Sequence, residues 1–232
     1  MNALSFEKLS FVLCPTTFPD STHEHIHQEN FSFWWNSWES VFRDMGLNQK
    51  LSSDLFTRQD FTASLFLDRE CIGQICFRVV ETQHLPTKLD SYFKNWTEKS
   101  MSLLTADGSR VLISSYLSVS KKYRGPAHFG VPVKDILIGF YGLLKQESLA
   151  SSIAAAPRKD RNVNRTCAEW GGVLVEESIP SGYGDLVDLV VFRNDCLAKA
   201  QGHPLFPAIQ SLWRKRISIS KSSQSKSLPL SA

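Results

Sequence analysis

The order of apolar and polar positions in the first part of the chain predicts a strand followed by an aromatic helix. Residues 6–14 partly alternate and stop at Pro15, which predicts an opening strand. Residues 15–29 are polar and are expected to form a loop. From Asn30 to Gly46 the apolar positions recur at helical spacing. One broad face of this helix carries large side chains, namely Phe31, Trp34, Trp35, Trp38, Val41, Phe42 and Met45.

The next segment predicts a hairpin, a second helix and an inner strand. Residues 61–67 and 71–80 are rich in β-branched and aromatic residues, and only Asp-Arg-Glu separates them, so they predict a hairpin. Residues 89–104 repeat apolar residues at helical intervals and predict a helix. Residues 111–119 carry apolar side chains on both faces, which is typical of a strand inside a sheet.

The second half of the chain alternates helices and strands. A helical stripe begins near Pro132 and contains Ile136, Leu137, Phe140, Leu143 and Leu144. Residues 151–156 predict a strand that Pro157 ends, and residues 164–170 predict a short helix stopped by two glycines. An antiparallel pair of strands and a last helical turn or two are then predicted at residues 173–179, 186–193 and 208–213.

Composition limits the architecture to one globular domain with a loose end. A chain of 232 residues with 42% hydrophobic content buries one substantial core. We expect residues 1–213 to form a single domain and residues 214–232, rich in Ser and Lys, to form a disordered basic tail. The net positive charge of the chain, +3, comes from its C-terminal end, because basic residues but no acidic residues follow Asp195. The tail is expected to solubilise the protein; contact with nucleic acid or anionic lipid is the alternative, and no nucleic-acid partner is expected.

Cysteine usage and hydropathy favour a reducing compartment. Five cysteines are odd in number and lack paired CxxC spacing, and no signal peptide is visible. No apolar run approaches the length of a membrane helix, so no transmembrane segment is expected. The sequence therefore predicts a soluble cytoplasmic protein.

A basic glycine turn lies between the strand at residues 111–119 and the following helix. It contains Lys121, Lys122, Arg124 and Gly125. Backbone N–H groups in such a turn converge at a helix N-terminus, where the helix dipole adds partial positive charge, so the turn suits a pyrophosphate. An ordinary surface turn with solvated basic side chains is the alternative. The helix and strand that follow favour an anionic cofactor that enters between two strands.

This order of elements, with two local segments, resembles the GNAT (GCN5-related N-acetyltransferase) superfamily over most of residues 31–193. The segment Leu-Ser-Val-Ser-Lys-Lys-Tyr-Arg-Gly at 117–125 is similar to its strand and pyrophosphate loop. The segment Asn-Val-Asn-Arg-Thr-Cys-Ala-Glu-Trp-Gly-Gly at 162–172 is similar to its Asn-containing helix that ends in glycine. The resemblance implies that these residues contact an acyl donor: Leu117, Ser118, Val119, Lys122, Tyr123, Arg124, Gly125, Gly130, Asn162 and Asn164.

The implied fold is an α/β domain with a mixed, mostly antiparallel sheet flanked by helices. The sheet should splay where the strand ending at Val119 and the strand starting at Ser151 separate. An acyl-pantetheine arm would enter this splay, with its thioester carbonyl polarised by backbone N–H groups near residues 117–119. The implied function is an N-acyltransferase that moves an acyl group from acyl-CoA, acetyl or longer, to an amine acceptor by direct attack.

Two departures from the family pattern change these expectations. The loop after Arg124 is longer than usual and contains Pro126, which donates no N–H, so one phosphate contact is missing. A donor carried as acyl-phosphopantetheine on an acyl carrier protein, with one phosphate, fits this loop. Cys167 stands where many relatives place a tyrosine that protonates the leaving thiolate. Its thiol is a candidate acid, and a small buried helix residue is the alternative.

A weaker likeness concerns the N-terminal half. Residues 38–43, Arg58 to Phe61, and the hairpin with Gly73 and Arg78 resemble autoinducer synthases and long-chain N-acyl amino acid synthases. In that reading the aromatic helix lines an acyl pocket, whereas plain core packing uses the same residues. A GNAT fold that has lost its chemistry and serves as a binding or interaction module is the second functional hypothesis.

Other constellations concern a base and a metal. Glu81, and His84 beside it, are candidates for the group that removes a proton from the amine. His23, His25 and His27 would share one face of a strand and suit zinc, but they lie in a polar loop without further ligands, so no metal is expected. A covalent hydrolase is disfavoured, since no Gly-x-Ser-x-Gly elbow occurs.

Overall fold

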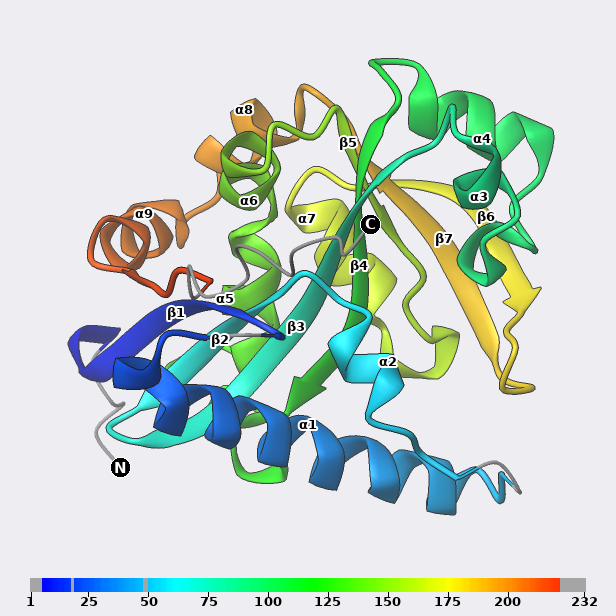
Figure 1. Cartoon of the computed structure of the whole chain (residues 1–232). Helices are drawn as coiled ribbons and strands as arrows, with labels where there is room; N and C mark the ends of the chain where they lie inside the picture. The colour runs from blue at the N-terminus through cyan, green and yellow to red at the C-terminus, as the bar shows by residue number, and fades with distance from the viewer. Residues whose placement is uncertain (1–5, 18, 48–49, 222–232) are drawn as a thin grey trace, which may run out of the picture.

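The computed structural model describes residues 6–17, 19–47 and 50–221, and its centre is one twisted, eight-stranded sheet with helices on both faces (Figure 1). The strand order is β6-β7-β5-β4-β3-β2-β1-β8. The strands are β1 (Leu9–Pro15), β2 (Phe61–Leu67), β3 (Glu70–Glu81), β4 (Arg110–Val119), β5 (Ser152–Ala155), β6 (Val173–Pro180), β7 (Leu186–Phe192) and β8 (Ile217–Ser218). This is the mixed α/β architecture that the sequence predicts.

Strand pairing is mostly antiparallel, with one parallel junction in the middle of the sheet. β1, β2, β3 and β4 form an antiparallel meander, and β5 pairs with β7, and β7 with β6, in the same antiparallel manner. β4 and β5 run parallel over four residue pairs. A parallel pair needs a crossover connection, which here is formed by the segment from the end of β4 through two helices. The short β8 adds a parallel pair at the far edge, beside β1.

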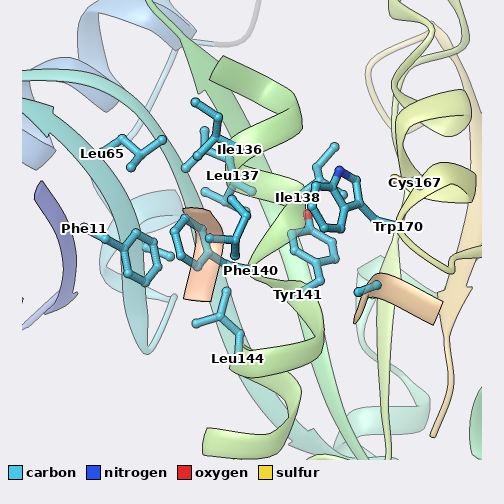
Figure 2. Packing of buried hydrophobic residues seen from close by; sticks show 14 of the residues in the cluster. Phe11, Leu65, Ile136, Leu137, Ile138, Phe140, Tyr141, Leu144, Cys167 and Trp170 are labelled. Carbon is cyan, nitrogen blue, oxygen red and sulfur yellow. The ribbon is translucent and has the colours of Figure 1, made fainter. Parts of the chain in front are cut away.

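Two groups of helices cover opposite faces of the sheet (Figure 1). On one face lie α5 (Val133–Gly139), α6 (Tyr141–Glu147), α7 (Val163–Glu169), α8 (Cys196–Gln201) and α9 (Phe206–Arg214). On the other lie α1 (Glu24–Asp44), α2 (Asp54–Thr57), α3 (Leu85–Lys88) and α4 (Glu98–Thr105). The first face carries the larger apolar core, in which Phe140 stacks on Phe11 of β1 while Tyr141 points to the other side of its helix (Figure 2).

Glycines let helices on this face approach closely. A Cβ on Gly73 of β3 would lie 2.8 Å from Val133 of α5, and a Cβ on Gly139 would lie 2.9 Å from the ring of Trp170. Real Cβ atoms do not come that close, so larger residues at either position would push the helix away. α5 therefore lies tightly against β3, and the chain after α7 packs tightly against α5.

α1 is longer than the sequence predicts. It begins at Glu24, not at Asn30, so residues 24–29, expected in a loop, are helical. A short 3-10 turn at Ser21–His23, capped by Asp20, leads into it. The histidine segment is therefore helical, and residues two apart on a helix do not face one another. Within the part of the chain described, no group of three His, Cys, Asp or Glu side chains is arranged to hold a metal.

The helix predicted at residues 89–104 is wrong in its extent. The structure has α3 before this range, a 3-10 turn at Ser91–Phe93, and α4 only from Glu98. Asp90 accepts a hydrogen bond from the N–H of Tyr92, and Thr97 accepts one from the N–H of Ser100. Each side chain caps a new helical start, so the chain turns twice where apolar spacing alone suggests continuity.

The C-terminal boundary also differs from the expectation. Residues 214–221, expected in the disordered tail, belong to the fold: α9 ends at Arg214, β8 pairs with β1, and Ile219 is buried. Arg216 pairs with Glu147 at 2.9 Å, and its guanidinium lies 4.2 Å from the ring centroid of Trp213. The remaining tail prediction, residues 222–232, lies outside the described residues.

Two further features of the fold concern its cysteines and the apolar character of its helices. All five cysteines are buried and unpaired. Among the described residues, no helix combines the length and apolar character needed to span a bilayer. The predicted cytoplasmic location stays a prediction.

Candidate active site

The parallel ladder between β4 and β5 ends while β4 continues. Its last partners are Ser114 and Ala155, after which β4 runs on to Val119 and the other strand stops. Beyond this pair the two chains separate, because no further ladder holds them together. The predicted splay in the sheet is therefore present, with Ser114 and Ala155 at its narrow end.

A bulge in β4 lies just beyond this point. Cys76 of β3 pairs with Ser115 and Gln74 pairs with Ser118, so Tyr116 and Leu117 together face a single residue, Ile75. Tyr116 has φ of 58°, a left-handed conformation that is uncommon for a tyrosine. A bulge leaves the extra residue unpaired and bends the strand. The N–H groups expected to polarise a thioester thus lie where the ladder is locally disrupted.

The bulge also sends the ring of Tyr116 into the aromatic cluster of α1. Its ring centroid lies 5.7 Å from that of Trp34 and 4.9 Å from that of Trp38, both edge-to-face. Burial, and then the neighbouring Tyr183, raise the pKa of Tyr116 above its ordinary value. The unusual backbone is therefore held by packing on the α1 side.

A small cavity of about 140 Å³ opens at the splay on the side of α5, α6 and α7. Its wall is mainly apolar and includes Leu117 of the bulge and Val163 and Cys167 of α7. Tyr141 of α6 also lines it, and its hydroxyl lies 2.5 Å from the Oγ of Ser114. Arg158 and Arg161 stand at the wall formed by the chain after β5.

A larger cavity of about 470 Å³ lies on the side of α1 and α2. One part of its wall is apolar, formed by Trp38, Phe42, Met45, Leu55, Trp96 and Ile179. Another part is polar, formed by Arg58, Gln59, Arg78, Asp90, Tyr92, Arg158 and Asp185. Its size and mixed lining are typical of a small-molecule site.

The two cavities meet at the splay. They share the wall residues Trp38, Ser114, Ser115, Tyr116, Ala156 and Arg158. Successive strand residues point to opposite faces, so Ser114 faces α6, whereas Ser115 pairs with Cys76 on the α1 side. The two cavities therefore border one another beside the bulge.

The charges of the large cavity are only partly paired. Arg78 contacts Asp90 at 2.8 Å, and Arg158 contacts Asp185 at 3.1 Å. Burial raises the pKa of Asp90, but hydrogen bonds from Arg78 and from the N–H of Tyr92 outweigh it and hold the pKa below its ordinary value. Arg58 is exposed, and none of the ion pairs among the described residues involves it. The cavity therefore offers one uncompensated cation.

Three residues of this polar wall carry buried atoms without a hydrogen-bond partner. These atoms are the Oε1 of Gln59, the Nε of Arg78 and the hydroxyl of Tyr92. The Nε2 of Gln59 donates to the carbonyl of Leu55 at 3.1 Å, which fixes the amide and leaves its oxygen as an acceptor. A buried polar group without a partner costs about 1–3 kcal/mol. These three residues therefore bring polar groups without a partner in the protein into the wall of this cavity.

The turn between β4 and α5 is exposed and basic, as the sequence predicts. Lys122 and Arg124 are exposed, and the Nε of Arg124 donates to the carbonyl of Val119 at 3.2 Å. Tyr123 is instead buried, with its ring 5.9 Å from that of Phe129, and anchors the turn to the core. Gly125 is exposed, whereas Gly130 has φ of 74° and donates its N–H to Pro126.

The Asn-containing helix α7 presents only part of what the sequence predicts. Asn162 has φ of 52° and is exposed at the start of the helix. The amide of Asn164 is used within the protein, because it donates to Asp188 at 2.7 Å and accepts from the N–H of Arg165. Lys134 of α5, which the sequence analysis does not single out, donates to Asp135 and Thr166 and joins the two helices.

Cys167 lies in the wall of the small cavity, in agreement with its expected place, but as a buried thiol. Its exposed fraction is 1%. Burial raises the pKa of Cys167 to about 12, although the ammonium of Lys134 acts in the opposite direction. The thiol therefore stays protonated near neutral pH, and as a hydrogen-bond donor a thiol is weak.

The proposed base lies elsewhere. Glu81 pairs with Arg110 at 3.4 Å and accepts from the hydroxyl of Ser109 at 3.0 Å, at the opposite end of β4 from the bulge. Six residues along a strand separate Arg110 from Tyr116, which is roughly 20 Å. Neither Glu81 nor His84 lines either cavity. The structure therefore does not bring Glu81 to the other candidate residues.

Several residues that line the cavities cannot be identified as site residues from the sequence alone. Tyr141 falls in the apolar stripe of its helix and is indistinguishable from core by spacing. Arg158 follows β5 in a loop, and Arg58 and Arg78 are weighed only as part of a family likeness. The arginines lie far apart in sequence, and only the fold places them around one cavity.

No protein-family model matches the chain, and no curated protein sequence matches it. Several solved structures match the chain in fold. BjaI, a CoA-dependent acyl-homoserine lactone synthase solved with SAM and isopentyl-CoA, is 11% identical with a TM-score of 0.55, over 89% of this chain and 99% of that one. FeeM, an N-acyl amino acid synthase from uncultured soil microbes, is 11% identical with a TM-score of 0.53, over 86% and 98%. These likenesses show that the chain has the GNAT-like acyltransferase fold that the sequence predicts.

Proposed function

We propose that this protein is an N-acyltransferase in which donor and acceptor reach the β4 bulge from opposite faces of the sheet. The observation that carries the proposal is the meeting of the two cavities at Ser114, Tyr116 and Ala156. A transfer between two substrates without a covalent enzyme intermediate needs both reacting groups side by side. Two cavities that border one another beside a disrupted ladder are suited to this requirement.

The donor side is the small cavity. An acyl-pantetheine arm would lie along the splay, with its thioester carbonyl accepting from a backbone N–H in the stretch Leu117 to Val119, where the bulge disrupts pairing. The exposed Lys122 and Arg124 would contact the phosphates of acyl-CoA or the phosphate of a carrier-bound phosphopantetheine. Both acyl-CoA and a carrier-bound acyl-phosphopantetheine remain candidate donors. Pro126 lacks an N–H group and so favours the carrier protein, whose arm has one phosphate. Arg161 at the cavity wall favours either donor, because both are anionic.

The acceptor side is the large cavity. An amine that also carries an anionic group fits the uncompensated charge of Arg58 and the unpartnered atoms of Gln59 and Arg78. The apolar wall, which includes Trp38, Phe42 and Met45 of α1, would hold the acyl chain or the body of the acceptor. The proposed acyl pocket thus uses the C-terminal half of the aromatic helix. Phe31 and Trp34 pack in the core instead.

A second candidate, a GNAT-fold module that binds a donor without chemistry, is favoured by one observation. Cys167 occupies the usual place of the acid and is a buried thiol with a raised pKa. This candidate shares the donor cavity with the first and differs only in turnover.

Mass spectrometry of ligands retained after gentle purification, followed by thiol-release assays, separates these candidates. The assays combine acetyl-, octanoyl- and palmitoyl-CoA and the matching acyl carrier proteins with a panel of amines that includes amino acids. Thiol release that depends on the amine supports the transferase. Donor binding without release across the panel supports the binding module, and absence of binding to every donor contradicts both.

A further inference from the structure

Two hydroxyl groups meet at the narrow end of the splay. The Oη of Tyr141 lies 2.5 Å from the Oγ of Ser114, and both side chains are buried. Both residues line the small cavity, and Ser114 lines the large cavity as well. Because Ser114 is the last β4 residue in the parallel ladder, the pair stands where the donor and acceptor cavities join.

Packing fixes the ring of Tyr141 in this place. Its centroid lies 4.8 Å from that of Phe192 and 5.7 Å from that of Phe77, on two different strands. The residue is 3% exposed, so its hydroxyl has no bulk water around it. Burial raises the pKa of Tyr141, which keeps the phenol protonated across the physiological range. The wall of the small cavity therefore contains a protonated phenol whose ring is held by packing.

The same cavity wall carries the alternative donor, Cys167, on α7. A thiol is a weak hydrogen-bond donor, whereas a phenol is a strong one. Burial raises the pKa of the leaving thiol in the same way as it raises the pKa of the phenol. The two pKa values therefore stay close, and proton transfer from the phenol to the sulfur has only a small free-energy cost. Tyr141 is therefore better suited than Cys167 to protonate the leaving thiolate, both in its position and in its strength as a hydrogen-bond donor.

We propose that Tyr141 is the general acid of the acyl transfer and that Ser114 positions its hydroxyl. This inference rests on the proposed function. The amine nitrogen forms a bond to the thioester carbon, and the carbon–sulfur bond breaks with its electron pair going to sulfur. The phenolic proton of Tyr141 passes to that sulfur. The proton that the amine loses returns the phenolate to phenol through water, so the products are an amide and a free thiol.

The test compares Tyr141→Phe, Ser114→Ala and Cys167→Ala with the wild-type protein in amine-dependent thiol release. Tyr141→Phe keeps the packed ring, and circular dichroism checks its fold. The acid contributes about 10²–10⁴-fold to rate, so kcat should fall at least about a hundredfold in Tyr141→Phe while the donor Kd changes less than about threefold. Ser114→Ala should lower kcat less and alter its pH profile, and Cys167→Ala should lower kcat less than Tyr141→Phe does.

A change of leaving group distinguishes proton donation from a structural role. With an aryl thioester donor, whose thiol is more acidic, the defect of Tyr141→Phe should shrink at least about tenfold, because the leaving thiolate needs less protonation. An equal defect with both donors, or a kcat within about threefold of wild type, overturns the assignment of Tyr141 alone. A wild-type protein that binds donors but releases no thiol from any of them overturns the transferase proposal together with it.

Discussion

Trp38 of α1 donates its indole N–H to the hydroxyl of Ser118 at 2.9 Å, across 80 residues of sequence. The same hydroxyl donates to the carbonyl of Tyr116 at 3.1 Å. The aromatic helix is thereby tied to the strand segment directly after the bulge. This link connects the wall of both cavities to the backbone that would hold the thioester.

Replacing Trp38 by Phe should loosen this connection. The variant loses one partly buried hydrogen bond and part of a packed ring, so the free energy of unfolding should fall by about 1–2 kcal/mol. For a chain of this size, that is a fall in Tm of roughly 2–8 °C. Trp35→Phe, on the same helix but outside both cavities, is the matched control. Equal Tm values for the two variants would show that the link contributes no stability.

The ion pair of Arg158 and Asp185 should be structural as well as part of the cavity wall. Arg158→Met leaves the carboxylate of Asp185, which is 16% exposed, without this partner, and should lower the unfolding free energy by about 1–3 kcal/mol. Asp160, which also pairs with Arg158, is 53% exposed. Asp160→Asn should therefore change stability by less than about 0.5 kcal/mol in urea denaturation. A larger loss of stability in Asp160→Asn than in Arg158→Met would contradict this prediction.

Arg58 should act on the acceptor and not on the chemistry. Arg58→Ala removes the uncompensated cation of the large cavity, so KM for an anionic amine should rise about tenfold while kcat stays nearly constant. The effect should be smaller at high salt, since the site is exposed. Arg69→Ala, in the exposed turn between β2 and β3, is the control. A lowered kcat with unchanged KM would contradict the acceptor role.

Asp90 should make stability depend on pH in the acid range. Its folded-state pKa is lowered, so its contribution is present above the ordinary carboxyl pKa of about 3.9 and is lost as pH falls through the folded value. Wild-type protein should thus lose more stability than Asp90→Asn when pH falls from about 5 to 3. Urea denaturation at several pH values measures this, with Asp54→Asn on α2 as control. Parallel curves for wild type and Asp90→Asn would contradict it.

The sequence predicts those parts of the fold that are set by local pattern. The β2–β3 hairpin is confirmed because two apolar runs flank a short turn, which in the structure consists of Asp68 and Arg69. β4, β5 and α7 lie within a residue or two of their predicted bounds. The helix expected at residues 89–104 is wrong because side-chain caps at Asp90 and Thr97 outweigh apolar spacing.

The candidate site is less accessible from sequence than the fold. The loop with Arg124 and the strand with Leu117 carry a recognisable local pattern. The bulge at Tyr116 does not, because nothing in the residue type indicates a left-handed backbone. The role proposed for Tyr141 depends on a contact with Ser114, 27 residues away, and on which side of the helix Tyr141 faces. Such relations follow from tertiary packing.

Donor binding to Ala156→Phe tests whether an acyl donor enters between β4 and β5. Ala156 lines both cavities, so a phenyl ring there would fill the opening through which the proposed acyl arm would enter. Ala168→Phe places the same ring on the exposed side of α7. Calorimetric titration with acyl-CoA and acyl carrier protein should show that wild type and Ala168→Phe bind alike, whereas Ala156→Phe binds at least about tenfold more weakly, about 1.4 kcal/mol. Unchanged affinity in Ala156→Phe would contradict entry of the donor between β4 and β5.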